Sequence, residues 1–234
     1  MPRIGVFVGS SPLPMTGESL SLNLQTPWGD ASAPPQKYVV GDYEYLILSR
    51  HGAQHEFAPH QINYRANIWL MHSLGVDGLL GTYTVGSIDP ALAVGQLVVP
   101  SQLIDYSWGR ASTFDDKLHH IEFTQPYDTL LRQQVLQADG ALVDGGVYAC
   151  TQGPRLETAA EIKRLAQDGA TLVGMTGMPE AALARELDIP FAALCLVVNP
   201  AAGVSDDVID MQALAEISAT GGARMLDVLI QLAA

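Results

Sequence analysis

The sequence predicts an α/β protein, in which a mixed and mostly buried β-sheet is flanked by helices within a single domain over residues 1–234. Short apolar or β-branched runs, typical of strands, alternate along the chain with segments whose apolar residues recur at helical spacing. Hydrophobic residues make up 48% of the sequence, which argues against a disordered chain and allows a sizeable core. No internal repeat and no linker divides the chain.

The first half of the chain is predicted to contain several strands and one helix. The run 3–9 ends at a glycine and indicates a buried strand followed by a turn. The stretch 14–36 is rich in Pro, Gly, Ser and Thr and predicts an extended excursion over the surface. The other expected elements are strands over 43–50 and 96–106, a helix over 63–75, and a strand followed by a Gly-containing loop over 76–87.

The second half repeats this alternation and ends in a helix. The run 190–203 is apolar nearly throughout rather than alternating, which predicts a strand buried on both faces. The helix expected over 179–189 carries a proline in its first turn, where a missing N–H costs nothing. The other expected elements are a strand running into a loop over 145–155, an amphipathic helix over 156–170 and a strand over 171–178.

Charge and cysteine content exclude several classes of function. The formal net charge of −13 disfavours nucleic acid and anionic membranes as partners. Cys150 and Cys195 lie in apolar runs, so we expect reduced core thiols rather than a disulfide, and no Cys/His cluster suggests a metal site. The N-terminal residues lack the layout of a signal peptide and no apolar run is long enough to cross a bilayer, which predicts a cytoplasmic protein.

Several polar residues follow predicted strands, where α/β proteins place their sites. Gly9 with Ser10 and Ser11 could bring backbone N–H groups to an anion, or form an ordinary turn. Arg50, followed by His51, could hold phosphate through two N–H groups, or form a surface salt bridge.

Two threonines offer further anion ligands. Thr84 could present its hydroxyl and its N–H to an oxyanion, or cap the next turn. Thr176 stands just before a predicted helix, which favours anion binding but equally suits a helix N-cap.

Asn199 and Glu157 are candidate ligands of a heterocyclic base. An amide at the end of an apolar strand needs partners and can read a ligand's donor and acceptor edge, although Asn before proline is also common in turns. Glu157 lies near a predicted helix start, where a carboxylate can also simply offset the helix dipole.

The order of these segments is more specific than any one of them. RHGAQHEFAPHQINYRANIW, GTYTVGS, YACTQGPRLETAAEI and GMTGMPEAALARELDIPFAALCLVVNPAAG together strongly resemble the trimeric class of purine nucleoside phosphorylases, in particular its methylthioadenosine/methylthioinosine phosphorylase branch. The resemblance extends over nearly the whole chain and is most specific over 145–203.

The resemblance implies the nucleoside phosphorylase fold, a cytoplasmic homotrimer and phosphate-dependent cleavage of a purine nucleoside, with inorganic phosphate as co-substrate and no cofactor or metal. Matching residues would bind phosphate through Ser10, Arg50, His51, Thr84 and Thr176. Met175 would pack on the sugar, Asn199 and Glu157 would act on the base, and His120 with Phe123 would cover the sugar of a neighbouring subunit. Donors aimed at the departing base, and phosphate held under the sugar, would stabilise the charge-separated transition state.

The residues around Asn199 also suggest which nucleoside is used. Adenosine-type members of this branch carry aspartates where this chain has Asn199 and Ala201, and Glu157 can accept from the N1–H that only 6-oxopurines carry. Residues 204–215 contain no histidine to bind a 5′-hydroxyl, and Val208, Ile209 and Met211 suit a 5′-methylthio group. S-methyl-5′-thioinosine is the substrate we expect.

Two departures from the family pattern keep other functions open. Ser11-Pro12 replaces a glycine-containing phosphate loop, and Tyr83 stands where the family has Asn or Thr. The alternatives are a phosphorylase for inosine and guanosine or for methylthioadenosine, a purine-binding protein with impaired phosphorolysis, and a hydrolase that uses water.

Overall fold

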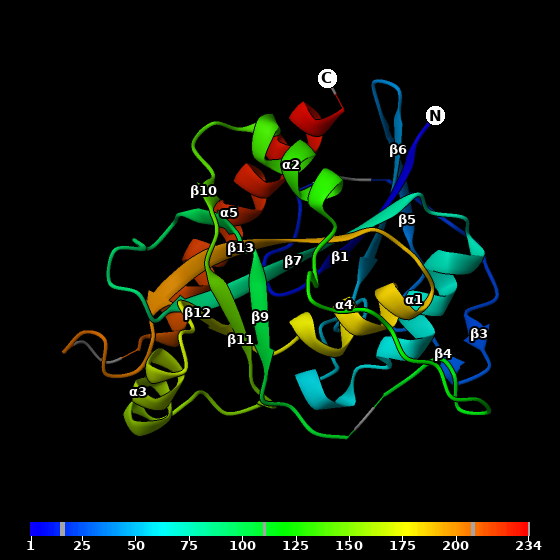
Figure 1. The fold of residues 1–234 in the computed structure, drawn as a ribbon. Helices are drawn as coiled ribbons and strands as arrows, with labels where there is room; N and C mark the ends of the chain where they lie inside the picture. Colours follow the sequence, from blue (N-terminus) through cyan, green and yellow to red (C-terminus); the bar gives the residue numbers. More distant parts are fainter. Residues whose placement is uncertain (15–16, 110, 207–208, 234) are drawn as a thin grey trace.

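The structure is a computed structural model that describes residues 1–14, 17–109, 111–206 and 209–233 (Figure 1). Its strands are β1 (Arg3–Val8), β2 (Glu18–Ser19), β3 (Gln25–Thr26), β4 (Gly29–Asp30), β5 (Gln36–Val40), β6 (Tyr43–Ser49), β7 (Gly78–Ser87), β8 (Leu97–Val99), β9 (Gln102–Asp105), β10 (Val143–Asp144), β11 (Val147–Cys150), β12 (Leu172–Gly174) and β13 (Phe191–Pro200). Its helices are α1 (Tyr64–Ser73), α2 (Thr129–Ala138), α3 (Ala159–Gln167), α4 (Gly177–Glu186) and α5 (Met211–Leu232), with a 3-10 turn at Pro59–Gln61.

The sheet is mixed, with a parallel centre. Strands β6, β1, β7 and β13 run parallel and side by side, while β5 and β8 add antiparallel neighbours on either side. Strands β9, β11 and β12 form a parallel group that joins the main sheet where β12 pairs antiparallel with β7. The fold class expected from the sequence is therefore confirmed.

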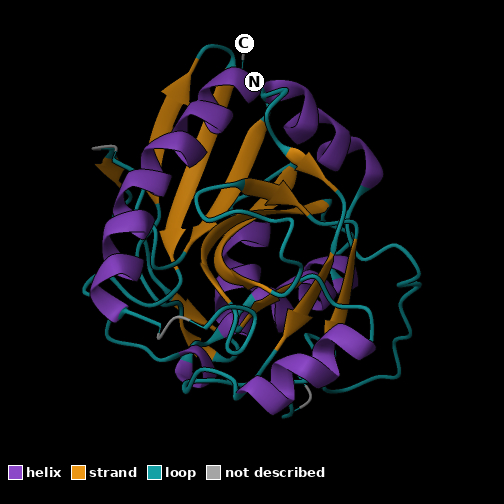
Figure 2. Ribbon diagram, turned by 90° about the vertical axis from the view of Figure 1, so that its left-hand side faces the viewer, coloured by secondary structure: helices purple, strands orange, loops and turns teal. Residues whose placement is uncertain are grey.

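Helices cover the sheet and are seen around it in Figure 2. Helices α1 and α4 pack on each other, and α4 also packs on β7, β11 and β13. Helices α2 and α5 form a second pair that packs on β13. Among the described residues, no helix is both long enough and apolar enough to cross a membrane.

An unpaired stretch along β7 determines where the site lies. Strand β1 pairs with β7 only as far as Gly81, and β12 begins to pair with it at Gly86. The N–H of Leu79 donates to Pro190 O and so points toward β13. Backbone N–H and C=O groups alternate sides along a strand, so those of the even-numbered residues of β7 point to the opposite side, where β1 lies. Between the end of β1 and the start of β12, no strand of the described part of the chain pairs with this edge of β7.

Three sequence expectations need correction. Strand β7 continues to Ser87, so Thr84 lies on a strand and not in a Gly-containing loop. The strand expected over 96–106 is interrupted between Val99 and Gln102, where Pro100 has no N–H to donate. Helix α2 was not expected, because Leu131 and Val135 are its buried residues and they give only a weak apolar pattern.

Candidate active site

A cavity of about 870 Å³ opens at the carboxyl ends of the central parallel strands. It lies along the unpaired stretch of β7 and is closed on other sides by the loop after β6, the segment before α3, and the N-terminal part of α5. Ten of the residues expected at the site line it: Ser10, Arg50, His51, Thr84, Glu157, Met175, Thr176, Asn199, Ile209 and Met211.

Arg50 lies at the base of the cavity and is almost fully committed to the protein. Its Nε and Nη2 donate to the two carboxylate oxygens of Glu180 at 2.7 and 3.2 Å. Its Nη1 donates to Thr82 O at 2.7 Å, and Nη2 also donates to Phe7 O at 3.0 Å. A guanidinium has five N–H groups, so one N–H, on Nη1, has no hydrogen-bond partner in the described part of the chain, although the side chain itself is fully buried. The salt bridge of Arg50 is therefore buried and not on the surface, and contact with phosphate through Arg50 stays a prediction.

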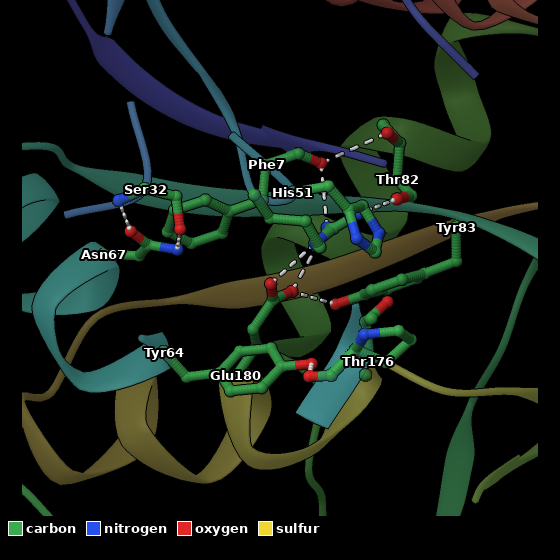
Figure 3. A network of polar contacts seen from close by, with 12 residues as sticks. Phe7, Ser32, His51, Tyr64, Asn67, Thr82, Tyr83, Thr176 and Glu180 are labelled. Atoms are coloured by element: carbon green, nitrogen blue, oxygen red, sulfur yellow. Dashed lines mark hydrogen bonds and ion pairs between the residues drawn. The ribbon is translucent and has the colours of Figure 1, made fainter. Parts of the chain in front are cut away.

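Glu180 is a residue of the site region that sequence reasoning missed. Only 1% of its surface is exposed, and besides Arg50 it accepts a hydrogen bond from the Tyr83 hydroxyl at 2.7 Å (Figure 3). Burial opposes the positive charge on Arg50, but Glu180 and its neighbours outweigh this effect and raise the arginine pKa. The charge of Arg50 is therefore balanced within the chain.

Tyr83 turns its side chain into the protein interior. The Arg50 guanidinium lies over its ring, 4.7 Å from the ring centroid. A Cβ on Gly81 would lie 2.1 Å from the Tyr83 hydroxyl oxygen, so the ring folds back over the bare glycine two residues earlier. Burial, followed by the charge of Glu180, raises the Tyr83 pKa well above its usual value, so the hydroxyl stays protonated and donates.

His51 is held as a neutral imidazole. Its Nδ1 is 2.8 Å from Phe57 O, and because a carbonyl can only accept, Nδ1 carries the proton. Burial lowers the pKa of His51 to about 4, an effect that the Phe57 hydrogen bond opposes and nearby Arg50 reinforces. At neutral pH the other ring nitrogen, Nε2, is therefore an unprotonated acceptor.

Of the two serines in the loop after β1, Ser10 lines the cavity and Ser11 does not. Ser11 is buried, its hydroxyl donates to Ser218 O of α5, and Ser11 is not among the residues that line the cavity. Ser10 is exposed and lines the cavity. A Cβ on Gly9 would lie 2.7 Å from Arg50 Nη1 and 3.8 Å from His51 Nε2, so both nitrogens approach one spot beside the bare Gly9.

Thr176 offers its side chain but not its backbone. It occupies the N-cap position of α4, yet its hydroxyl makes no capping hydrogen bond. The N–H groups of Thr176 and Gly177 point at the Tyr148 hydroxyl at 3.4 and 3.3 Å, and that of Met178 points at Cys150 Sγ. The first N–H groups of α4 therefore point at buried protein atoms and not at the cavity. The Thr176 hydroxyl is the group at this helix start that could bind an anion.

Thr84 can contribute backbone as well as side chain. The carbonyl of Thr82 points to the unpaired side of β7, where it accepts from Arg50. Backbone groups of residues two apart in a strand point the same way, so the N–H of Thr84 also points to that side. The sequence prediction of a Thr84 N–H donor thus has a structural basis in the missing strand.

Asn199 and Glu157 line another part of the same cavity. A β-bulge between Val197 and Asn199 shifts the register of β13 at its end and re-aims the side chain. Asn199 Nδ2 donates to Pro200 O at 2.6 Å, and Glu157 Oε1 accepts from the Thr151 hydroxyl at 2.5 Å. Each side chain keeps one further oxygen, Asn199 Oδ1 and Glu157 Oε2, for a ligand.

The sugar-side residues are only partly brought together. Met175 lines the cavity and is held against Gly153, where a Cβ would lie 2.6 Å from its sulfur. Ile209 and Met211 line the cavity near the start of α5, whereas Val208 lies outside the described residues. His120 is exposed, Phe123 is half-buried against the main core, and neither lines the cavity.

The family model described as the Phosphorylase superfamily matches residues 3–233. The chain therefore belongs to this superfamily, and it is an enzyme of the phosphorylase type. It is 52% identical, over 82% of its length and 81% of the relative's, to a probable S-methyl-5′-thioinosine phosphorylase of Pseudomonas syringae pv. tomato. It is also 44% identical, over 86% of its length and 78% of the relative's, to the S-methyl-5′-thioadenosine phosphorylase of Mycolicibacterium smegmatis.

A solved structure shares the fold. The methylthioadenosine phosphorylase of Schistosoma mansoni, in complex with adenine, superimposes with a TM-score of 0.92 at 25% identity. The alignment covers 100% of this chain and 91% of that one. The family resemblance and the fold expected from the sequence are confirmed.

Proposed function

We propose that the protein cleaves S-methyl-5′-thioinosine with inorganic phosphate, giving hypoxanthine and 5-methylthioribose 1-phosphate. One observation carries this proposal: a single cavity is lined both by Ser10, Arg50, Thr84 and Thr176, which we assign to phosphate, and by Asn199 and Glu157, which we assign to the base. A nucleoside bound between these two sets of residues would have its purine at Asn199 and Glu157 and its sugar next to the bound phosphate.

The chemistry follows from this arrangement. An oxygen of phosphate forms a bond to the anomeric carbon as the bond from that carbon to the purine nitrogen breaks and its electron pair passes to the base. Positive charge builds on the sugar and negative charge on the purine in the transition state. Donors fixed around phosphate and base stabilise both partners without reorganising, and holding them together removes much of the entropic barrier.

The base-binding pair supports a 6-oxopurine. Asn199 can donate to or accept from the purine edge, and Glu157 Oε2 can accept from an N1–H. Ala201 is 4% exposed and lines the same cavity, so no carboxylate there accepts from a 6-amino group. Ile209 and Met211 provide apolar surface for a 5′-methylthio group, against which a 5′-hydroxyl would be unpaired.

A homotrimer in the cytoplasm, using inorganic phosphate and no other cofactor or metal, is part of the proposal. Trp108 is 75% exposed and Leu118 is 85% exposed, and both belong to the segment that leads to His120. Large apolar side chains left exposed on this segment are the support for an interface here. A neighbouring subunit contacting this segment would place its own cavity next to His120 and Phe123.

A second candidate is a purine-binding protein with impaired phosphorolysis. Its support is that Arg50 is committed to Glu180 and that the N–H groups at the start of α4 are committed to Tyr148 and Cys150. The deciding experiment measures hypoxanthine release from S-methyl-5′-thioinosine with and without phosphate. Release that requires phosphate supports the phosphorylase. Purine binding without release supports the second candidate, and release without phosphate indicates a hydrolase.

A further inference from the structure

The anion-binding part of the cavity has an unusual balance of charge. Arg50 is paired with buried Glu180, and burial lowers the pKa of His51 to about 4, so its imidazole is neutral at physiological pH. The remaining ligands, Ser10, Thr84 and Thr176, contribute neutral hydroxyl or N–H groups. No uncompensated positive charge among these residues would attract an oxyanion for its charge alone.

His51 Nε2 lies within this neutral group and has a lone pair to offer. The Nδ1 proton is fixed by Phe57 O, which sets the tautomer. Among the residues that the structure describes, none donates a hydrogen bond to Nε2. A Cβ built on Gly9 would lie 3.8 Å from Nε2 and 2.7 Å from Arg50 Nη1, so an oxyanion bound beside Gly9 would have an acceptor and a donor nitrogen close to it.

The surroundings favour this state of the imidazole. Arg50 precedes it in the chain, and Thr84 lines the cavity from β7, whereas the Tyr83 side chain turns inward to Glu180. Thr176 lies on the α4 side, where the carboxylate of Glu180 binds Arg50 and Tyr83 rather than His51. His55 stacks on His51 with ring centroids 4.5 Å apart, and Glu56 and Glu157 line the cavity without a hydrogen bond to His51.

We propose that His51 determines oxyanion specificity: its Nε2 accepts a hydrogen bond from a hydroxyl of the bound oxyanion, so the site takes protonated phosphate or arsenate and disfavours sulfate. Both forms of phosphate present near neutral pH, and the corresponding forms of arsenate, carry such a hydroxyl, whereas sulfate has none. With sulfate, the Nε2 lone pair would face an unprotonated oxygen and go unpaired, a loss of about 1–3 kcal/mol, or about five- to 150-fold in affinity. The attacking oxygen is one that carries no proton, so this contact needs no proton transfer.

This inference rests on the proposed phosphorolysis, and it is tested by both binding and kinetics. Thermal stabilisation of the purified protein by phosphate, arsenate and sulfate is compared at pH 7.5 and constant ionic strength. The inhibition constant of sulfate against phosphate is then measured with S-methyl-5′-thioinosine. The expected result for the unaltered protein is a preference for phosphate over sulfate of about tenfold or more in both measurements.

Variants at His51 distinguish the effect of the Nε2 acceptor from that of the Nδ1 hydrogen bond to Phe57. In His51→Gln the side-chain amide can place an N–H near the Nε2 position, and we expect the preference for phosphate over sulfate to fall about tenfold through tighter sulfate binding. In His51→Asn the N–H toward Phe57 O can persist but no atom reaches the Nε2 position, so phosphate should weaken with no gain for sulfate. His55→Gln, which removes the stacked imidazole, should leave the ratio of phosphate to sulfate binding unchanged.

The outcomes distinguish this inference from the proposed function. Equal stabilisation of the unaltered protein by sulfate and phosphate, or an unchanged ratio in His51→Gln, overturns the role of His51 even if phosphorolysis is observed. Phosphate-independent release of base, with oxyanion selectivity still measurable by thermal stabilisation, overturns the proposed function and leaves the role of His51 standing as a binding property.

Discussion

Glu180 binds Arg50 along one edge of the guanidinium, and both side chains are buried, at 1% and 0% exposed. A buried ion pair of this kind contributes little net stability, but removing one partner leaves the other charge uncompensated. Arg50→Ala and Glu180→Ala should therefore each lower the free energy of unfolding by about 3–5 kcal/mol. Urea unfolding at pH 7.5 measures this. Loss of phosphate affinity with unchanged stability in Arg50→Ala would show that the arginine serves the ligand and not the core.

Thr176→Ala provides a cleaner test of the phosphate site, because its hydroxyl makes no capping hydrogen bond. We expect the KM for phosphate to rise about tenfold or more, as for a lost hydrogen bond to a charged group, with a smaller change in the KM for the nucleoside. Ser11→Ala is the matched control, since its hydroxyl donates to Ser218 O and does not reach the cavity. Equal changes in both KM values would place Thr176 outside the phosphate site.

Replacing Asn199 and Ala201 together by aspartate should move preference from the 6-oxopurine to the 6-amino nucleoside. Two carboxylates can accept from an exocyclic amine but repel a 6-oxo group. The measurement is the ratio of kcat/KM for methylthioinosine and methylthioadenosine, which should shift toward the latter by about tenfold or more. The interpretation of the base-binding pair is wrong if the unaltered enzyme already prefers methylthioadenosine.

The stability of the protein should depend on pH through His51. Its pKa is about 4 in the folded chain and 6.5 ordinarily, so between these values the unfolded chain binds more protons than the folded one. The free energy of unfolding should therefore fall as pH decreases from 6.5 toward 4, and fall less in His51→Gln. Denaturant unfolding at several pH values tests this, with His72→Gln on the exposed side of α1 as control. Identical pH profiles for the unaltered protein and His51→Gln would contradict it.

The proposed trimer predicts that His120 acts across an interface. His120 does not line the cavity of its own chain, so His120→Ala should raise the KM for the nucleoside only through a neighbouring subunit. Analytical ultracentrifugation gives the assembly size, and kinetics give the KM values for nucleoside and phosphate. A fully active monomer at assay concentration, or an unchanged nucleoside KM in His120→Ala, would contradict this arrangement.

Much of the site could be predicted from the sequence because strand ends are local features. Apolar runs followed by Ser10, Arg50 and Asn199 located the carboxyl edge of the sheet, and the family resemblance connected these segments. The partners of these residues could not be predicted in the same way. Glu180 is 130 positions from Arg50, and nothing local to Arg50 indicates it. The sequence around Glu180 does carry a signal. Glu180 stands beside Ala181 and Ala184, which are buried in α4, and a carboxylate among apolar positions needs a cation as partner.

The role of Thr84 depended on strand pairing, which the sequence did not settle. Gly86 and Ser87 favour a loop after a shorter strand. The structure continues the strand and instead leaves one side of it without a neighbour. Packing over the whole sheet decides where neighbouring strands diverge, so the sequence alone does not show that the Thr84 N–H is left without a strand partner.

Along the unpaired stretch of β7, a bound oxyanion would accept a hydrogen bond that a neighbouring strand would otherwise accept. Without a ligand, the amide of Thr84 has no strand partner on that side, so the deuterium uptake of this segment should be fast compared with that of Leu79, whose amide is bonded to Pro190 O. An oxyanion that accepts from the Thr84 N–H would slow this uptake. Local opening of the sheet would then depend on whether the oxyanion site is occupied. The enzyme would then be most rigid at its centre only while the co-substrate is bound.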